Sequence, residues 1–191
     1  MINKTLKHWR FRVFTLSWLA YAGFYFCRKN FSVTMPIIID ELGYTKNDMA
    51  IVLTVYSFTY MVGQFISGYM SDRLGPRLIV SIGLSIAVVA NFTMGMTGSL
   101  LAFAFLMGAN GFGQSTGWSG LIKNMTPWYM PKERGVVMSW WSTCYVIGAF
   151  LATIFATYWA TNEYIFVELG WKRAYIMPAL VLAVITILYG V

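Results

Sequence analysis

The chain has 191 residues, of which 58% are hydrophobic and only 11% are charged, and it carries a net charge of +7. A soluble domain carries about 25% charged residues, and a disulfide-rich domain needs more than two cysteines. These figures exclude an ordinary soluble enzyme, a disordered protein and a disulfide-rich secreted domain. The positive charge does not indicate a nucleic-acid partner, because no basic patch alternates with aromatic residues.

Long uncharged runs, separated by short polar turns, divide the chain into six stretches. The run from Leu78 to Ile122 contains no acid or base, and the turn Thr97-Gly98-Ser99 splits it in two. A membrane-spanning helix needs about 20 mostly apolar residues. We therefore predict an all-α membrane protein with a cytoplasmic N-terminal segment at 1–12 and a six-helix bundle over 13–191. The expected spans are 13–39, 49–70, 78–96, 100–122, 136–161 and 174–191.

Basic residues gather on one side of these spans. The side of the N-terminus would hold Lys4, Lys7, Arg10, Arg12, Arg73, Arg77, Lys123, Lys132 and Arg134, and the other side would hold Lys46, Lys172 and Arg173. Loops rich in lysine and arginine stay in the cytoplasm. We therefore expect an integral, multi-pass membrane protein, of the inner membrane if bacterial, with both termini in the cytoplasm. The first apolar run is too long for a cleaved signal peptide, so we expect an uncleaved signal-anchor.

Arg28 and Lys29 lie near the middle of the first span. A basic residue at the bilayer centre costs about 2.5–3.5 kcal/mol on the insertion scale. Arg28 is too far from either end of the span for its side chain to reach the interface. A buried ion pair is the structural alternative, but spans two to six place no obvious carboxylate near their midpoints. The missing counter-charge predicts an anion that comes from outside the protein.

Helical spacing places aromatic hydroxyls around this guanidinium. At 100° per residue, one face of the first span carries Tyr21, Tyr25, Arg28, Ser32 and Met35, with Lys29 on its flank. Tyr56, Tyr60 and Gln64 form a second polar stripe in the next span. Such spacing is often no more than packing, but a buried tyrosine must place its hydroxyl. We predict that Tyr21, Tyr25 and Tyr60 line a binding site.

The chemistry of these stripes suits an oxyanion. A guanidinium offers five donors in a planar fork, and it binds phosphate or carboxylate bidentately at any working pH. Cys27 and Cys144 both lie inside predicted spans and indicate neither a disulfide framework nor a metal site. We expect no cofactor. We also expect no enzyme, because the single histidine, His8, precedes the first span and no nucleophile–base pair stands out.

The fourth span is rich in small residues. It carries Gly108, Gly111, Gly113, Gly117 and Gly120, and Gly113 with Gly117 forms a GxxxG pair that lets helices approach closely. Close packing accounts for most of these glycines, although a glycine-rich helix can also bend beside a pathway. Asn110 and Gln114 are polar in mid-span and either pair between helices or line a cavity.

The loop between the second and third spans carries a recognisable motif. Gly68-Tyr-Met-Ser-Asp72-Arg73-Leu-Gly75-Pro-Arg77 matches the G-x-x-x-D-R-x-G-x-R pattern of the major facilitator superfamily, at the same place. The resemblance implies one six-helix half of that fold, built as a 3+3 inverted repeat. An acid at a helix C-terminus is unfavourable against the helix dipole. We therefore expect Asp72 to have a cationic or helix N-terminal partner and to act as a gate latch.

The resemblance becomes narrower at several places. Tyr25-Phe-Cys-Arg28-Lys29-Asn30-Phe31 with Met35-Pro36 resembles the first helix of the organophosphate:phosphate antiporters, which include glycerol-3-phosphate and hexose-phosphate transporters. Gly117-Trp118, Lys132-Glu133-Arg134-Gly135, Trp171 and Met177-Pro178 are also similar to that family. The likeness covers most of the chain.

This resemblance implies roles for individual residues. Arg28 matches the family's phosphate-binding arginine, and Lys29, Tyr21, Tyr25 and Tyr60 match residues around that site. We expect Gln64, Trp118 and Tyr145 to take part in substrate binding as well. Three positions depart from the pattern. Gln64 stands where glycerol-phosphate members carry a lysine, Tyr145 where many bacterial members carry a histidine, and Ser119-Gly120 where paired prolines follow Gly-Trp. These departures do not affect the expected phosphate site. They leave open which organic group the substrate carries and whether transport includes a proton-linked step.

Three functions are compatible with these residues. The first is a secondary transporter that exchanges an organophosphate for inorganic phosphate by alternating access. The second is a membrane sensor of an external sugar phosphate, and the third is a transporter of another organic anion. Superfamily members have two six-helix halves, with the site between them. This chain supplies one half, so the opposing wall of the cavity must come from a second half. We expect the sequence to be a fragment of a longer protein, which is a better explanation than a half-transporter that dimerises or a degenerate product.

Overall fold

The computed structural model describes residues 4–190, and within that range it contains six α-helices and two short 3₁₀-helices. The α-helices are α1 (Lys4–Leu42), α2 (Lys46–Leu74), α3 (Pro76–Met94), α4 (Leu100–Met125), α5 (Pro131–Thr161) and α6 (Arg173–Gly190). The 3₁₀-helices are η1 (Thr126–Trp128) and η2 (Val167–Lys172). Each expected span falls on one of the α-helices. However, α3 ends two residues before the expected end, where the N–H groups of Met96 and Thr97 bond three residues back instead of four, and residue 191 lies outside the described range.

Four helical stretches are long and apolar enough to cross a membrane. These are α2, α3, α5 and the stretch Val167–Gly190, which contains α6. The other two helices carry polar residues in mid-helix, Arg28 and Lys29 in α1 and Asn110 and Gln114 in α4, and these lower the mean hydropathy. The prediction of an all-helical membrane protein is therefore confirmed, whereas four candidate spans are found among the described residues and the expected number of six stays a prediction.

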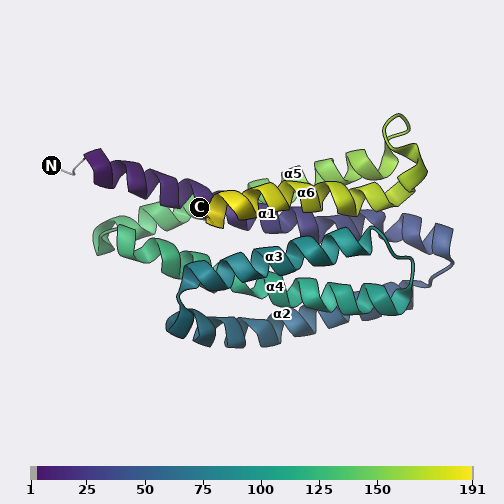
Figure 1. The fold of residues 1–191 in the computed structure, drawn as a ribbon, viewed down its shortest axis with the longest axis horizontal. Coiled ribbons are helices and arrows are strands. Elements are labelled where there is room, and N and C mark those ends of the chain that lie inside the picture. Colours follow the sequence, from purple (N-terminus) through teal and green to yellow (C-terminus); the bar gives the residue numbers. More distant parts are fainter. Residues whose placement is uncertain (1–3, 191) are drawn as a thin grey trace.

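The six helices lie side by side as two groups of three (Figure 1). In one group α4 packs against α2 and α3, and in the other α1 packs against α5 and α6. Contacts between α3 and α6, and between α1 and α4, join the two groups. Helix α1 begins and helix α6 ends at the same end of the bundle, which we call the termini end (Figure 1). The α2–α3 and α4–α5 connections lie there too.

Local sequence signals explain where the helices begin. Thr45 caps α2 through its hydroxyl, and the carboxylate of Asp48 accepts a hydrogen bond from the Thr45 N–H in return. Pro76 and Pro131 open α3 and α5, where a missing N–H costs nothing. Gly75 joins α2 to α3 with a φ of +87°, a conformation that side chains disfavour.

The N-terminal residues continue the first helix. Residues 4–12, expected as a separate segment, belong to α1 and are fastened to the α4–α5 connection. Arg10 forms an ion pair with Glu133, and its guanidinium lies 4.5 Å from the centre of the Tyr129 ring. The Tyr129 hydroxyl donates to the Arg10 carbonyl at 2.9 Å, and burial raises the pKa of Tyr129. The termini end of α1 is therefore held in place.

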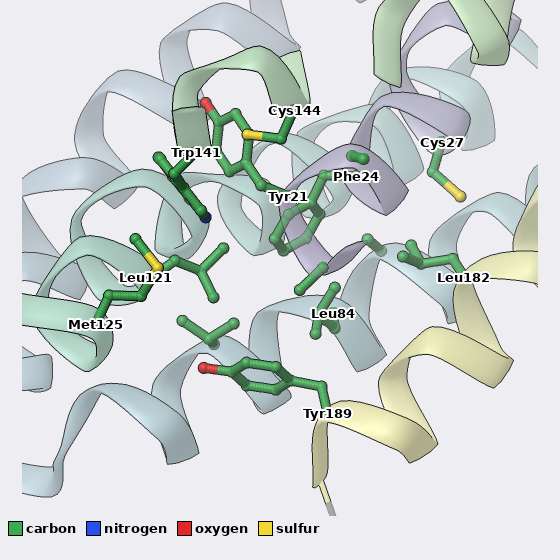
Figure 2. Packing of buried hydrophobic residues seen from close by; sticks show 14 residues of the cluster. Tyr21, Phe24, Cys27, Leu84, Leu121, Met125, Trp141, Cys144, Leu182 and Tyr189 are labelled. Atoms are coloured by element: carbon green, nitrogen blue, oxygen red, sulfur yellow. The ribbon is translucent and has the colours of Figure 1, made fainter. Parts of the chain in front are cut away.

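The core divides into two clusters along the bundle. One gathers around Tyr21, Phe24 and Trp141, with side chains from α3, α4 and α6 filling the space between them (Figure 2). The other gathers around Phe31 and Phe103 toward the far end. Many large apolar side chains point outward instead, with Leu101 81% and Phe65 79% exposed. This outward apolar surface is typical of a protein that meets lipid.

Glycines set the helix spacing, as the small-residue pattern predicts. Gly83 of α3 lies against Gly113 and Thr116 of α4, where an added Cβ would overlap the Gly113 carbonyl. Gly148 of α5 lies against α1 in the same way, with Ala22 Cα 2.8 Å from the position of an added Cβ. Backbones can approach this closely only where a side chain is absent.

We expect Gly83→Ala to lower the thermal stability of the protein. The methyl group would meet backbone, which cannot move aside as a side chain can, and such overpacking costs about 1–3 kcal/mol. Gly135→Ala is the matched control, because nothing lies within 4 Å of that position and alanine favours the helix. A thiol-reactive dye reads the melting temperature in detergent, since Cys27 and Cys144 are buried until unfolding. Equal melting temperatures for the two variants would contradict the close contact.

Candidate functional site

Arg28 lies half-buried in the middle of α1, among aromatic side chains. Its guanidinium carbon is 5.0 Å from the ring centre of Tyr25, 5.1 Å from that of Tyr60 and 5.8 Å from that of Tyr56. Its Nε donates to the side-chain oxygen of Gln114 at 2.8 Å. Over residues 4–190, the ion pairs are Arg10–Glu133 and Lys123–Asp72, so Arg28 faces no carboxylate.

Gln114 of α4 holds this guanidinium through a network of buried hydrogen bonds. Its side-chain oxygen also accepts from the Tyr56 hydroxyl at 3.1 Å. Its amide nitrogen donates to the Cys27 carbonyl at 3.1 Å and to the Asn110 oxygen at 3.0 Å. Asn110 donates to the same Cys27 carbonyl at 2.8 Å. Every donor and acceptor of the Gln114 amide is used, so the amide cannot rotate, and it fixes the plane of the guanidinium.

A cavity opens directly on Arg28. It has a volume of about 130 Å³ and is lined by Arg28, Tyr56, Ser57 and Tyr60. A larger hollow of about 560 Å³ follows along α2, lined by Tyr60 and Gln64 among others. The hydrogen bond to Gln114 uses one of the five N–H donors of the guanidinium. The arrangement can therefore hold an oxyanion against a fixed, positively charged fork.

The structure brings some of the predicted site residues together. Tyr25 and Tyr60 lie against Arg28, as the helical spacing predicts. Tyr21 is buried in the core cluster, and its ring centre is 5.8 Å from that of Tyr25 and 5.5 Å from that of Trp118. Neither Tyr21 nor Trp118 is among the described residues whose rings lie over the Arg28 guanidinium.

Three other predicted residues lie apart from the Arg28 cavity. Gln64 lines the neighbouring hollow, one helical turn beyond Tyr60. Tyr145 is on α5 with 44% of its surface exposed, and Lys29 is half-buried beside Arg28. None of the three is among the described residues that line the Arg28 cavity.

Sequence reasoning did not include Tyr56 or Gln114 among the site residues. Tyr56 does belong to the polar stripe of the second span, so its place beside Tyr60 follows from the helical spacing. Gln114 stood out as a polar residue in mid-span. A buried amide must find hydrogen-bond partners, and the Nε–H of Arg28 is a strong donor to its oxygen. The sequence showed that Gln114 is a polar residue in mid-span, but it did not show that its partner is Arg28.

The loop motif places its acid next to a cation. The Asp72 carboxylate lies 2.6 Å from Lys123 Nζ, and the same ammonium group donates to the Gly68 carbonyl at 3.1 Å. Arg77 Nη2 donates to the Gly190 carbonyl of α6 at 2.7 Å, and the Arg73 guanidinium lies over the Tyr69 ring. The cationic partner expected for Asp72 is therefore Lys123 of α4. The motif links α2, α3, α4 and α6 at the termini end.

Because the resemblance of the loop motif implies a gate latch, we expect Asp72→Asn to change the rate of the implied transport cycle without unfolding the protein. The two side chains are 68% and 38% exposed, so the pair contributes about 1 kcal/mol or less, which corresponds to about a fivefold shift in a two-state equilibrium. Lys123→Gln should have the same effect. The charge-swapped pair Asp72→Lys with Lys123→Asp should recover part of the wild-type transport rate in vesicles. A swap no better than either single variant would show that the ion pair is not the latch.

Comparisons with known proteins show which family this chain belongs to. Residues 17–191 match the Major Facilitator Superfamily. The "Probable hexose phosphate transport protein" of Chlamydia pneumoniae is 36% identical over 94% of this chain and 38% of its own length. The "Glycerol-3-phosphate transporter" of Bacillus subtilis is 31% identical over 98% of this chain and 42% of its own length. The "Membrane sensor protein UhpC" of Escherichia coli is 35% identical over 80% of this chain and 35% of its own length.

These relatives are named as transporters and a membrane sensor, and none of the three names is that of an enzyme. The chain spans about two fifths of the length of the relatives it matches. The expected resemblance to one half of an organophosphate transporter is thus confirmed. The chain belongs to the Major Facilitator Superfamily, and its relatives are the hexose phosphate and glycerol-3-phosphate proteins that make up the organophosphate:phosphate antiporter family.

Proposed function

We propose that this chain forms one half of a secondary transporter that exchanges an organophosphate for inorganic phosphate. The observation that carries the proposal is Arg28, a guanidinium in the middle of α1 with no carboxylate paired to it within residues 4–190. A lone cation in such a place needs an anion, and phosphate matches the planar fork of the guanidinium. The relatives named for hexose phosphate and glycerol-3-phosphate support the same class of substrate.

In this proposal the phosphate group binds Arg28, and its oxygens receive further hydrogen bonds from the hydroxyls of Tyr25, Tyr56 and Tyr60. Neutral donors add affinity without another fixed charge, so phosphate can also leave. Gln114 keeps the guanidinium oriented while the site is empty. Lys29, Gln64, Trp118 and Tyr145 then act on the organic part of the substrate or on the approach to the site.

We propose that a second six-helix half supplies the opposite wall of this cavity. All six helices cross the membrane in this arrangement, with the termini end in the cytoplasm. The packing partners support a 3+3 inverted repeat, because α1 packs on α5 and α6 as α4 packs on α2 and α3. Alternating access follows when the two halves rock around Arg28.

A sensor is the second candidate function. The identity to the Escherichia coli sensor, 35%, is nearly the same as the 36% to the hexose phosphate relative, so overall similarity does not separate the two. A sensor would use the same Arg28 site to bind a sugar phosphate but would not carry it across. It would also need a partner protein that receives the signal.

The test is labelled-phosphate counterflow in proteoliposomes loaded with unlabelled phosphate. The gene product should be used at its native length. We expect labelled phosphate to accumulate transiently, and external glucose 6-phosphate or glycerol 3-phosphate to compete with it. No counterflow from well-inserted protein that still binds a sugar phosphate would favour the sensor. Counterflow of a carboxylate that phosphate cannot inhibit would favour another organic anion.

A further inference from the structure

A second cavity with basic walls lies at the termini end, between α1, α3, α4 and α6. Its volume is about 130 Å³. The residues that matter in its wall are Trp9, Arg12, Ser17, Arg77, Asn124 and Trp128. Ser17 precedes Arg28 by eleven residues, which is roughly 16 Å along a helix. None of the residues that line the Arg28 cavity lines this one.

The charge in this cavity is uncompensated. Arg12 and Arg77 both line it, and no described residue in its wall is Asp or Glu. The Arg77 guanidinium donates to the Gly190 carbonyl, and the Arg12 guanidinium lies 5.1 Å from the centre of the Trp9 ring. Neither contact neutralises a charge. The acids Asp72 and Glu133 at this end are already paired with Lys123 and Arg10.

Neutral polar groups complete the wall. The Ser17 side chain is fully buried, and its hydroxyl has no hydrogen-bond partner among the described residues. Asn124 donates to the Tyr189 hydroxyl at 3.3 Å, which leaves one amide hydrogen to offer. A buried hydroxyl without a partner is costly, and it signals a ligand or a role beyond packing. Two guanidinium groups with hydroxyl and amide donors form a set that suits a phosphate group.

The aromatic residues place this cavity at the membrane interface. Trp9 and Trp128 stack with ring centres 6.4 Å apart, and both line the cavity. Tryptophan is enriched at the level of the lipid headgroups, and basic pockets between transmembrane helices bind anionic headgroups. The same donors would also hold phosphate or an organophosphate from solution.

We propose that this cavity is a second phosphate-group site, separate from Arg28 and occupied by a lipid headgroup or by a phosphate in solution. Arg12 and Arg77 bind the phosphate group, which is either the diester of a lipid headgroup or a phosphate dianion from solution. Ser17 and Asn124 act as neutral donors. A bound phosphate neutralises the two arginines and joins α1 to α3 at the termini end. The proposal does not depend on transport by the Arg28 site.

The test measures binding to the full-length protein in a non-ionic detergent, in an Arg28→Gln background that removes the central site. The probes for calorimetric titration are dihexanoyl phosphatidylglycerol, inorganic phosphate, and dihexanoylglycerol as a control without phosphate. Arg12→Gln is compared with Lys7→Gln, which removes the same charge from an exposed position on the same helix, outside the cavity. We expect Arg12→Gln to weaken binding about tenfold and Lys7→Gln to leave it unchanged.

Each outcome decides the proposal. Binding of both phosphate probes supports a site for the phosphate group itself, and binding of only one identifies lipid or solution as the source. No saturable binding, equal effects of Arg12→Gln and Lys7→Gln, or equal binding of dihexanoylglycerol would overturn the site. If Arg12→Gln does not fold, Ser17→Ala replaces it, because it removes only the unpaired hydroxyl; we expect about threefold weaker binding, and unchanged binding would count against the site.

Discussion

Arg28→Lys should reduce phosphate exchange by about a hundredfold while the protein still inserts into the membrane. Lysine keeps the charge but loses the planar fork and the Nε donor that binds Gln114. Two lost charge-assisted hydrogen bonds correspond to about 3 kcal/mol, and each 1.4 kcal/mol is a factor of ten. The measurement is initial counterflow of labelled phosphate per unit of inserted protein.

Arg173→Lys is the matched control for this variant. Arg173 is also buried, and its Nε donates to the Gly170 carbonyl at 2.8 Å, but it lies at the far end of α6 from the termini. We expect Arg173→Lys to lower the amount of folded protein and to preserve the exchange rate of each molecule. Unchanged exchange in Arg28→Lys would remove Arg28 from the phosphate site.

Gln114→Glu should weaken phosphate binding by at least about tenfold. The new carboxylate would take the place of the oxygen that accepts from Arg28 Nε and would pair with the guanidinium. Two unit charges about 4 Å apart interact with about 4 kcal/mol at an effective dielectric constant of 20. The internal ion pair then competes with phosphate. The measurement is the phosphate concentration for half-maximal exchange.

Gln114→Met separates the effect of charge from that of position. Methionine has a similar size and no charge, so it removes the hydrogen bonds to Arg28 and Tyr56 but adds no competing anion. We expect a smaller loss of affinity together with a lower maximal rate, because the guanidinium is no longer held in one plane. An effect of Gln114→Glu equal to that of Gln114→Met would contradict electrostatic competition.

Much of this site could be predicted because its signals are local. Arg28 was evident from a charge in the middle of an apolar run, and Tyr25 and Tyr60 from four-residue spacing. The partner of Arg28 could not be predicted, because Gln114 is 86 residues away in sequence. Helical spacing also grouped Tyr21 with the site, although its ring packs into the core. A position on a helical face does not say which neighbouring helix that face meets.

The sequence by itself determined that this protein is a helical bundle in a membrane with a cation that lacks a counter-charge. The hydropathy of a span and a charge in its middle are properties of one continuous stretch of sequence, so both can be recognised from the sequence alone. The tertiary structure alone decided which groups surround that cation. The rotation of each helix about its axis depends on how closely backbones approach, as at Gly83 and Gly113. In the packed bundle Gln114, the residue after Gly113, meets Arg28. The same packing brought Arg12 and Arg77 to one cavity.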